Sequence, residues 1–297
     1  MHVRIALLAA PLLLANTDPP PLPPTIKAML DAAMASGNEG EVATVAKYAR
    51  AAAPDAAPAI TAAIDHWRKD RSAKREETLR NARVFDLWQG RAELGGYLTT
   101  GNTQDTGLSS TIDLSRETLR WRHKIHLAAD YKKSAGVISR EHYLAGYEPN
   151  FKFSPRGYVY GAAQFESDRF LGYTDRYSAS IGAGYSAIKK PGVTLDLELG
   201  PAYRDTSFTD RTRESSVAAR GSLDFDLRLS RAISVSQDAS AYFQHYNSTV
   251  SSTTALNAKL IGPLAARFSY VVQYESMPSI GRVGVDTTSR ASLAYSF

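Results

Sequence analysis

The stretch TLRWRHKIHLAADYK, Thr118–Lys132, alternates between two kinds of side chain. One set is mostly apolar or aromatic and includes Trp121, Ile125 and Tyr131, whereas the residues between them are mostly charged. A helix would mix the two sets on each face, and a strand separates them. The same period of two recurs in GVTLDLELGPAY (192–203) and GSLDFDLRLS (221–230), so the sequence predicts long strands over most of the chain.

Twelve runs of this kind follow Trp88, and their number and spacing indicate how the strands connect. Five connections are short (RETLR, SPRG, KKPG, LSRA and GPLA), whereas most of those between them are longer and more polar, as in KKSAGVISRE. An even number of strands with tight turns at one end and long loops at the other is typical of a transmembrane β-barrel. The runs lie near 88–100, 105–116, 119–132, 140–153, 157–168, 174–188, 193–207, 214–229, 232–247, 253–262, 265–276 and 286–297.

The two faces of each strand then have a physical assignment. Lipid offers no hydrogen bonds, so a membrane-spanning sheet must close, with its apolar face outward and its polar face toward a lumen. Aromatic residues near the short turns are expected at the membrane interface: Trp121, Phe151, Phe153, Tyr158, Tyr295 and Phe297. The predicted lumen-facing residues are Arg122, Lys124, Asp130, Glu148, Asp196, Glu198, Asp224, Asp226, Arg267 and Arg290. They carry both signs, which leaves two interpretations open: a narrow pathway for small solutes, or a lumen filled by ion pairs.

The chain ends as SRASLAYSF, Ser289–Phe297, and the alternation continues to the last residue. This pattern predicts that the final strand pairs with the first and closes the barrel. Tyr295 and Phe297 resemble the C-terminal assembly signal of bacterial outer-membrane barrels. That resemblance implies that the barrel assembly machinery binds this strand.

The first part of the chain differs from the rest. Residues 1–15 are predicted to be a signal peptide, with Arg4 before a short apolar run. Residues 16–85 are expected to form a periplasmic α-helical segment, followed by the barrel at 86–297. Its basic helix, 65–83, is interpreted either as a solvated linker or as a surface that contacts cell-wall polymer or inner-leaflet lipid.

Composition excludes several kinds of site. The absence of cysteine rules out disulfides and thiolate metal sites, and a net charge of +5 with interspersed signs gives no support for nucleic-acid binding. His123 and His126 fall on opposite faces of a strand, and no cofactor motif is found. His142 and His245 are expected near the outer rim, close to serines and aspartates, so an outer-membrane hydrolase with a rim or lipid-face active site remains an alternative.

The segment ELGGYLTTGNTQDTGLSSTIDLSRE, residues 93–117, adds a family resemblance. Its Gly95, Gly96 and the TTGNT element at 99–103 resemble the YdiY-type family, the so-called salt-induced outer-membrane proteins. The resemblance extends from about Trp88 to Phe297. It implies an outer-membrane location, contact with outer-membrane lipids and a link to salt stress, but no particular activity.

We therefore expect an all-β fold, an up-and-down antiparallel transmembrane β-barrel of about twelve strands with an N-terminal α-helical segment. The expected function is a porin-like or envelope-structural role in the bacterial outer membrane, without enzyme activity or a cofactor. Besides the hydrolase, a soluble exported β-sheet protein is a second alternative.

Overall fold

A computed structural model describes residues 22–99, 105–245, 247–278 and 284–297 of the chain. The predicted signal peptide, 1–15, and residues 100–103 of the TTGNT element lie outside these ranges. The chain divides after Thr78 into two compact units, a helical one and a β-barrel.

The helical unit consists of α1 (Pro24–Ala35), α2 (Glu39–Ala52), the short 3₁₀ helix η1 (Pro54–Ala56) and α3 (Ala57–Asn81). The Asn38 side chain caps α2 by accepting hydrogen bonds from the backbone N–H groups of Gly40 and Glu41. Leu30, Val42 and Ile60 form the buried core, one residue from each long helix. None of the helices in the described part of the chain is both long and apolar enough to cross a membrane.

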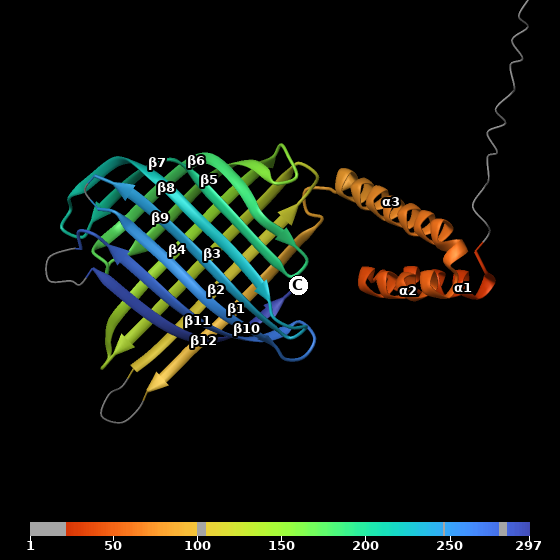
Figure 1. Ribbon diagram of the computed structural model, residues 1–297. Helices are drawn as coiled ribbons and strands as arrows, with labels where there is room; N and C mark the ends of the chain where they lie inside the picture. The colour runs from red at the N-terminus through yellow and green to blue at the C-terminus, as the bar shows by residue number, and fades with distance from the viewer. Residues whose placement is uncertain (1–21, 100–104, 246, 279–283) are drawn as a thin grey trace, which may run out of the picture. The chain divides into compact units, whose positions relative to one another are not determined.

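The second unit is a closed antiparallel barrel in which each strand pairs with its neighbours in sequence (Figure 1). The twelve strands are β1 (Trp88–Thr99), β2 (Asp105–Glu117), β3 (Trp121–Ser134), β4 (Val137–Lys152), β5 (Gly157–Asp168), β6 (Tyr173–Lys190), β7 (Val193–Phe208), β8 (Arg213–Arg228), β9 (Ile233–Gln244), β10 (Thr249–Lys259), β11 (Leu264–Glu275) and β12 (Val285–Ser296). The predicted fold class is confirmed, and most strand ends agree within two residues.

The last residue takes part in closing the barrel. β12 pairs with β1, and Phe297 exchanges backbone hydrogen bonds of 2.8 and 2.9 Å with Gly90. The Phe297 ring lies where a side chain at position 90 would otherwise stand, so a larger residue there would displace the ring. Phe297 also lies against Tyr295, with ring centroids 6.3 Å apart. The two residues of the predicted assembly signal therefore belong to the seam that joins the two ends of the sheet.

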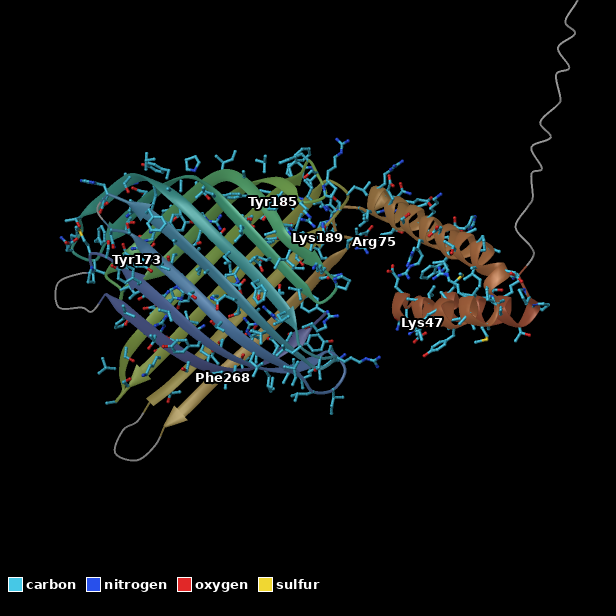
Figure 2. The ribbon with its side chains drawn as sticks, in the orientation of Figure 1. Lys47, Arg75, Tyr173, Tyr185, Lys189 and Phe268 are labelled. Atoms are coloured by element: carbon cyan, nitrogen blue, oxygen red, sulfur yellow. The ribbon has the colours of Figure 1, made fainter. Side chains whose placement is uncertain are left out.

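Much of the exterior of the barrel is apolar. In β6 the outward positions Tyr177, Ile181 and Tyr185 are all more than half exposed, and Val217 on β8 is 74% exposed. Tyr185 and Phe268 are drawn among the side chains of the barrel in Figure 2, where Tyr173 and Lys189 mark its opposite ends. Soluble monomers rarely expose apolar surface continuously, so this face fits lipid and disfavours the soluble alternative.

The contrast in loop length predicted from the sequence is largely wrong. β3 continues to Ser134 and β4 begins at Val137, so KKSAGVISRE forms a hairpin that turns at Ala135 and Gly136. Both turn residues have positive φ, 50° and 79°, as a tight two-residue hairpin requires. The polar residues near this turn belong to strands because water replaces lipid where a strand extends beyond the bilayer. The connections between strands that the structure describes in full are all two to four residues long.

Tyr158 is the second correction, because it lies inside the barrel instead of at the membrane interface. Its side chain is 2% exposed, and its hydroxyl donates a 3.1 Å hydrogen bond to Glu198. The ring lies directly over Gly184 of the next strand, where any Cβ atom would collide with it. Tyr160 and Gly182 form a second pair of this kind. Glycines on β6 thus make room for two tyrosines that fill part of the lumen.

Candidate functional site

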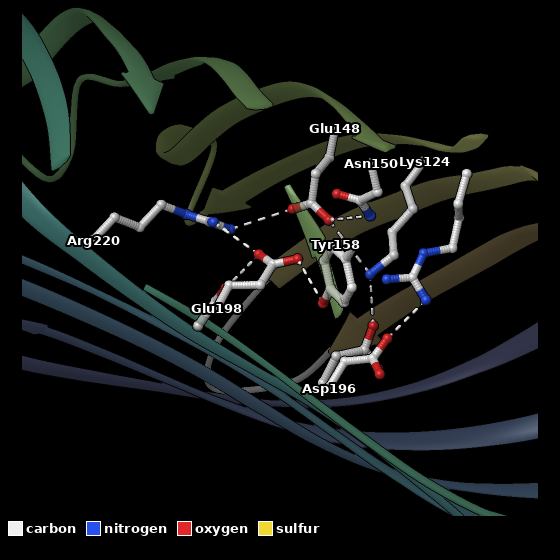
Figure 3. A network of polar contacts seen from close by, with 10 residues as sticks. Lys124, Glu148, Asn150, Tyr158, Asp196, Glu198 and Arg220 are labelled. Carbon is white, nitrogen blue, oxygen red and sulfur yellow. Dashed lines mark hydrogen bonds and ion pairs between the residues drawn. The ribbon is translucent and has the colours of Figure 1, made fainter. Parts of the chain in front are cut away.

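The basic residues of β3 reach across the lumen to acidic residues on the opposite wall (Figure 3). Arg122 Nη1 lies 2.7 Å from an Asp196 oxygen on β7, and Lys124 Nζ lies 2.9 Å from an Asp224 oxygen on β8. Lys124 also lies 3.5 Å from Glu148 on β4. Because β3 does not neighbour β7 or β8 in the sheet, these contacts can form only through the interior. They narrow the lumen at this level.

Glu198 is the centre of a neighbouring network, also shown in Figure 3. It accepts hydrogen bonds from Arg220 at 2.9 Å, Ser222 at 2.7 Å and Tyr158 at 3.1 Å. Arg220 also donates to Glu148 at 3.3 Å, which joins this network to the Lys124 contacts. Burying a carboxylate is costly unless donors and a cation compensate it, and Glu198 has both.

A second network has Asp130 at its centre and lies toward one end of the barrel, the end that carries the hairpin between β3 and β4, which we call the loop end. Arg290 lies 2.7 Å from the carboxylate and Arg140 lies 3.9 Å from it. His142 lies between two acids, with Nδ1 3.3 Å from Asp130 and Nε2 3.3 Å from Glu166. All of these side chains come from positions that alternate with the exposed apolar residues.

A third network lies on the lumen side of the wall near the seam of the barrel and joins β11 to β1. Arg267 of β11 lies 3.3 Å from Glu93 of β1 and donates to Asn257 at 3.0 Å. Arg91 lies 3.0 Å from both Glu93 and Asp113, its neighbours along the same wall. These contacts run along the wall and not across the lumen.

The structure brings nine of the predicted lumen-facing residues into these three networks. Asp226 is different, because among the described residues no cation lies within ion-pair distance of it.

Sequence reasoning missed several buried charges, among them Glu166 and Arg176. Extending the alternation of β5 beyond Gln164, and of β6 before Ser178, would have found both. Which charged residue meets which across the lumen cannot be read from alternation, because that depends on closure of the barrel.

A cavity of about 980 Å³ remains within the barrel despite these contacts. Its lining includes Glu93 on β1, Glu198 in the Figure 3 network, and Tyr173 and Glu275 near the loop end. The lumen therefore combines charged walls with space for small molecules.

His142 is not placed as the catalytic base of a hydrolase in the described part of the barrel. Both ring nitrogens of His142 face carboxylates, and no hydroxyl is within hydrogen-bonding distance of them among the described residues. Across the same ranges, no three His, Asp or Glu residues are placed to hold a metal ion. His123 faces outward against Tyr147, whereas His126 lies against Asp113.

A closed barrel with an apolar exterior and a charged lumen defines a transmembrane β-barrel of the kind found in bacterial outer membranes. The chain belongs to the family described as "Protein of unknown function, DUF481", whose model matches residues 92–297. It is also 26% identical over 212 residues to "Uncharacterized protein YdiY" of Escherichia coli (strain K12), covering 70% of this chain and 83% of that protein. The predicted YdiY-type family is confirmed.

Solved structures with a similar fold are outer-membrane barrels. The NanC porin is 10% identical with a TM-score of 0.43, and the match covers 70% of this chain and 98% of that one. An outer membrane channel from Pseudomonas putida F1 is 9% identical with a TM-score of 0.44, covering 73% and 99% of the two chains. At this level of similarity, function must be argued from the residues of this chain.

Proposed function

We propose that the barrel is a narrow passage for small polar solutes across the outer membrane. The cavity of about 980 Å³ inside the barrel is the observation that carries this proposal. Cross-lumen contacts such as Lys124–Asp224 limit its width, so only small molecules pass. Acids and bases line the same walls, so we expect weak conductance with little preference for either sign of ion.

Planar-bilayer recording and liposome swelling with the purified full chain test this function. We expect small conductance steps, and permeation of small sugars that falls steeply as the sugar becomes larger. Protein-containing liposomes that permeate no faster than protein-free ones, together with a silent bilayer, would contradict the proposal and favour the envelope-structural role. A large, strongly ion-selective conductance would also contradict it.

The N-terminal helical segment, 16–85, is proposed to lie in the periplasm and to contact an anionic envelope component. The barrel begins at Trp88 on β1 and ends at Phe297 after β12, and these two strands pair with each other. This pairing supports a position for both ends of the barrel on the same side of the membrane. α3 exposes a run of basic residues that includes Lys74 and Arg75. Such a run is attracted to anionic polymer or lipid.

Co-sedimentation with cell-wall sacculi and with anionic vesicles tests this contact and separates the two binding partners. We expect K74E/R75E to weaken binding, whereas K27E/K47E, which makes the same charge change on α1 and α2, leaves it nearly unchanged. Equal losses in both variants would show that only net charge matters.

A further inference from the structure

Arg204 on β7 is a buried arginine without a carboxylate partner. Its side chain points into the lumen and is 3% exposed. Nε donates to Ser178 Oγ at 3.1 Å, Nη1 donates to Thr249 Oγ1 at 2.8 Å, and the guanidinium lies 3.9 Å from the Tyr242 ring centroid. Among the described residues, no carboxylate oxygen lies within 4.0 Å of it.

Seven other inward-facing arginines differ from Arg204 in this respect. Each has a carboxylate oxygen within 4.0 Å: Arg91, Arg122, Arg140, Arg176, Arg220, Arg267 and Arg290. Arginine stays protonated in proteins, and a buried cation without an anion is costly. Hydroxyl oxygens and an aromatic ring offset only part of that cost.

The free edge of the guanidinium suits a carboxylate. Arg204 Nη2 donates to no acceptor among the described residues. The atom is accessible from the cavity that Arg204 lines. The Thr249 hydroxyl accepts from Nη1, so its own hydrogen is available for a second oxyanion contact. A planar carboxylate matches the two-pronged edge of a guanidinium, and such pairs are among the strongest hydrogen-bonded contacts.

The charged groups around this part of the lumen are paired with one another. Arg176 lies 3.1 Å from Glu275 and 3.9 Å from Glu166. These acids are also bonded elsewhere, Glu275 to Asn247 at 3.3 Å and Glu166 to His142 at 3.3 Å. The charge that these pairs leave uncompensated is that of Arg204, so a ligand with one carboxylate is enough to balance it.

We propose that Arg204 and Thr249, over the face of Tyr242, form a binding site for the carboxylate of a small hydroxylated monoacid. The inference rests on the proposed passage, because the solute must enter the lumen. The site lies toward the loop end, where Thr249 begins β10 and Glu275 ends β11. The site favours a solute that carries one negative charge. Because it is a single local charge, the lumen as a whole does not become selective for anions.

Calorimetric titration of the full chain folded in detergent tests the site, with D-gluconate as the probe. Sorbitol is the matched neutral compound, because it replaces the carboxylate by a hydroxymethyl group. We expect gluconate to bind and sorbitol not to bind. R204Q should weaken gluconate binding at least tenfold, whereas R213Q, at an outward-facing arginine that is 70% exposed, should leave it unchanged.

Several results would overturn the site: no gluconate binding by the unsubstituted protein, equal binding of sorbitol, or unchanged binding in R204Q. Should R204Q fail to fold, R204K and T249V replace it, because each keeps a similar volume and removes part of the two-pronged contact. We expect several-fold weaker binding in both, and unchanged affinity in both would reject the site. A protein that conducts but does not bind gluconate refutes only this site, and one that binds but does not conduct refutes only the passage.

Discussion

The ion pair between Lys124 and Asp224 spans the lumen from β3 to β8, so its removal tests whether such pairs narrow the passage. The double variant K124Q/D224N removes one positive and one negative charge and therefore leaves the net charge of the lumen unchanged. The side chains keep similar volumes but no longer hold each other across the lumen. We expect a larger conductance with unchanged ion selectivity.

The size of the effect follows from the exposure of the pair. The Lys124 and Asp224 side chains are 30% and 39% exposed, and the two charges lie 2.9 Å apart. An ion pair this accessible to water contributes about 1 kcal/mol. That free energy corresponds to about a fivefold change in the ratio between molecules in which the ion pair spans the lumen and molecules in which it is broken. Conductance should rise by up to about fivefold, whereas the barrel should stay folded.

Single-channel recording in planar bilayers measures this change, and R91Q/D113N is the matched control. Arg91 and Asp113 also lie 3.0 Å apart, but they belong to adjacent strands and their contact runs along the wall. The control variant should therefore conduct like the unsubstituted protein. Equal increases in the two variants, or no increase in K124Q/D224N, would refute the idea that cross-lumen pairs narrow the passage.

Three further outcomes are expected. Deletion of Phe297 should reduce the folded, heat-modifiable fraction on gels, because its ring and backbone seal the contact with Gly90; an undiminished folded fraction would contradict this. External protease should spare residues 17–85 in intact cells and remove them after permeabilisation, whereas cleavage in intact cells would place the segment outside. Gly184→Ala should destabilise the barrel by about 1–3 kcal/mol, because the new Cβ collides with the Tyr158 ring. Gly146→Ala, whose Cβ meets no atom nearer than 3.8 Å, should change thermal unfolding little.

Local alternation predicted the strands because the face of a strand residue depends only on its parity along the chain. β5, for example, lies at Gly157–Asp168, as expected from the sequence. Alternation could not predict where a strand ends beyond the bilayer. Water hydrogen-bonds to polar side chains there whether they belong to a strand or to a loop. For that reason β4 begins at Val137 and β10 at Thr249, each a few residues before the predicted start.

Residue type, unlike parity, misplaced an aromatic residue that fills the lumen. Tyr158 stands at an inward position of β5. An aromatic residue near a turn is, however, equally compatible with a position among the aromatic residues at the membrane interface. The ring is accommodated inside because Gly184 on the neighbouring strand leaves space for it. That space depends on the register between β5 and β6, which the sequence of neither strand shows by itself.

The sequence by itself determined that this chain forms a transmembrane barrel with a mixed-charge lumen, because strand period and the lack of hydrogen-bonding partners in lipid leave few other folds. Only the tertiary structure decided which charges meet. Arg122 and Asp196 are far apart in the chain and come within 2.7 Å once the sheet closes. By the same closure Arg204 lies among Ser178, Thr249 and Tyr242 without a carboxylate. Contacts across a lumen depend on strand number, tilt and register together, and these are properties of the closed sheet and not of any single strand.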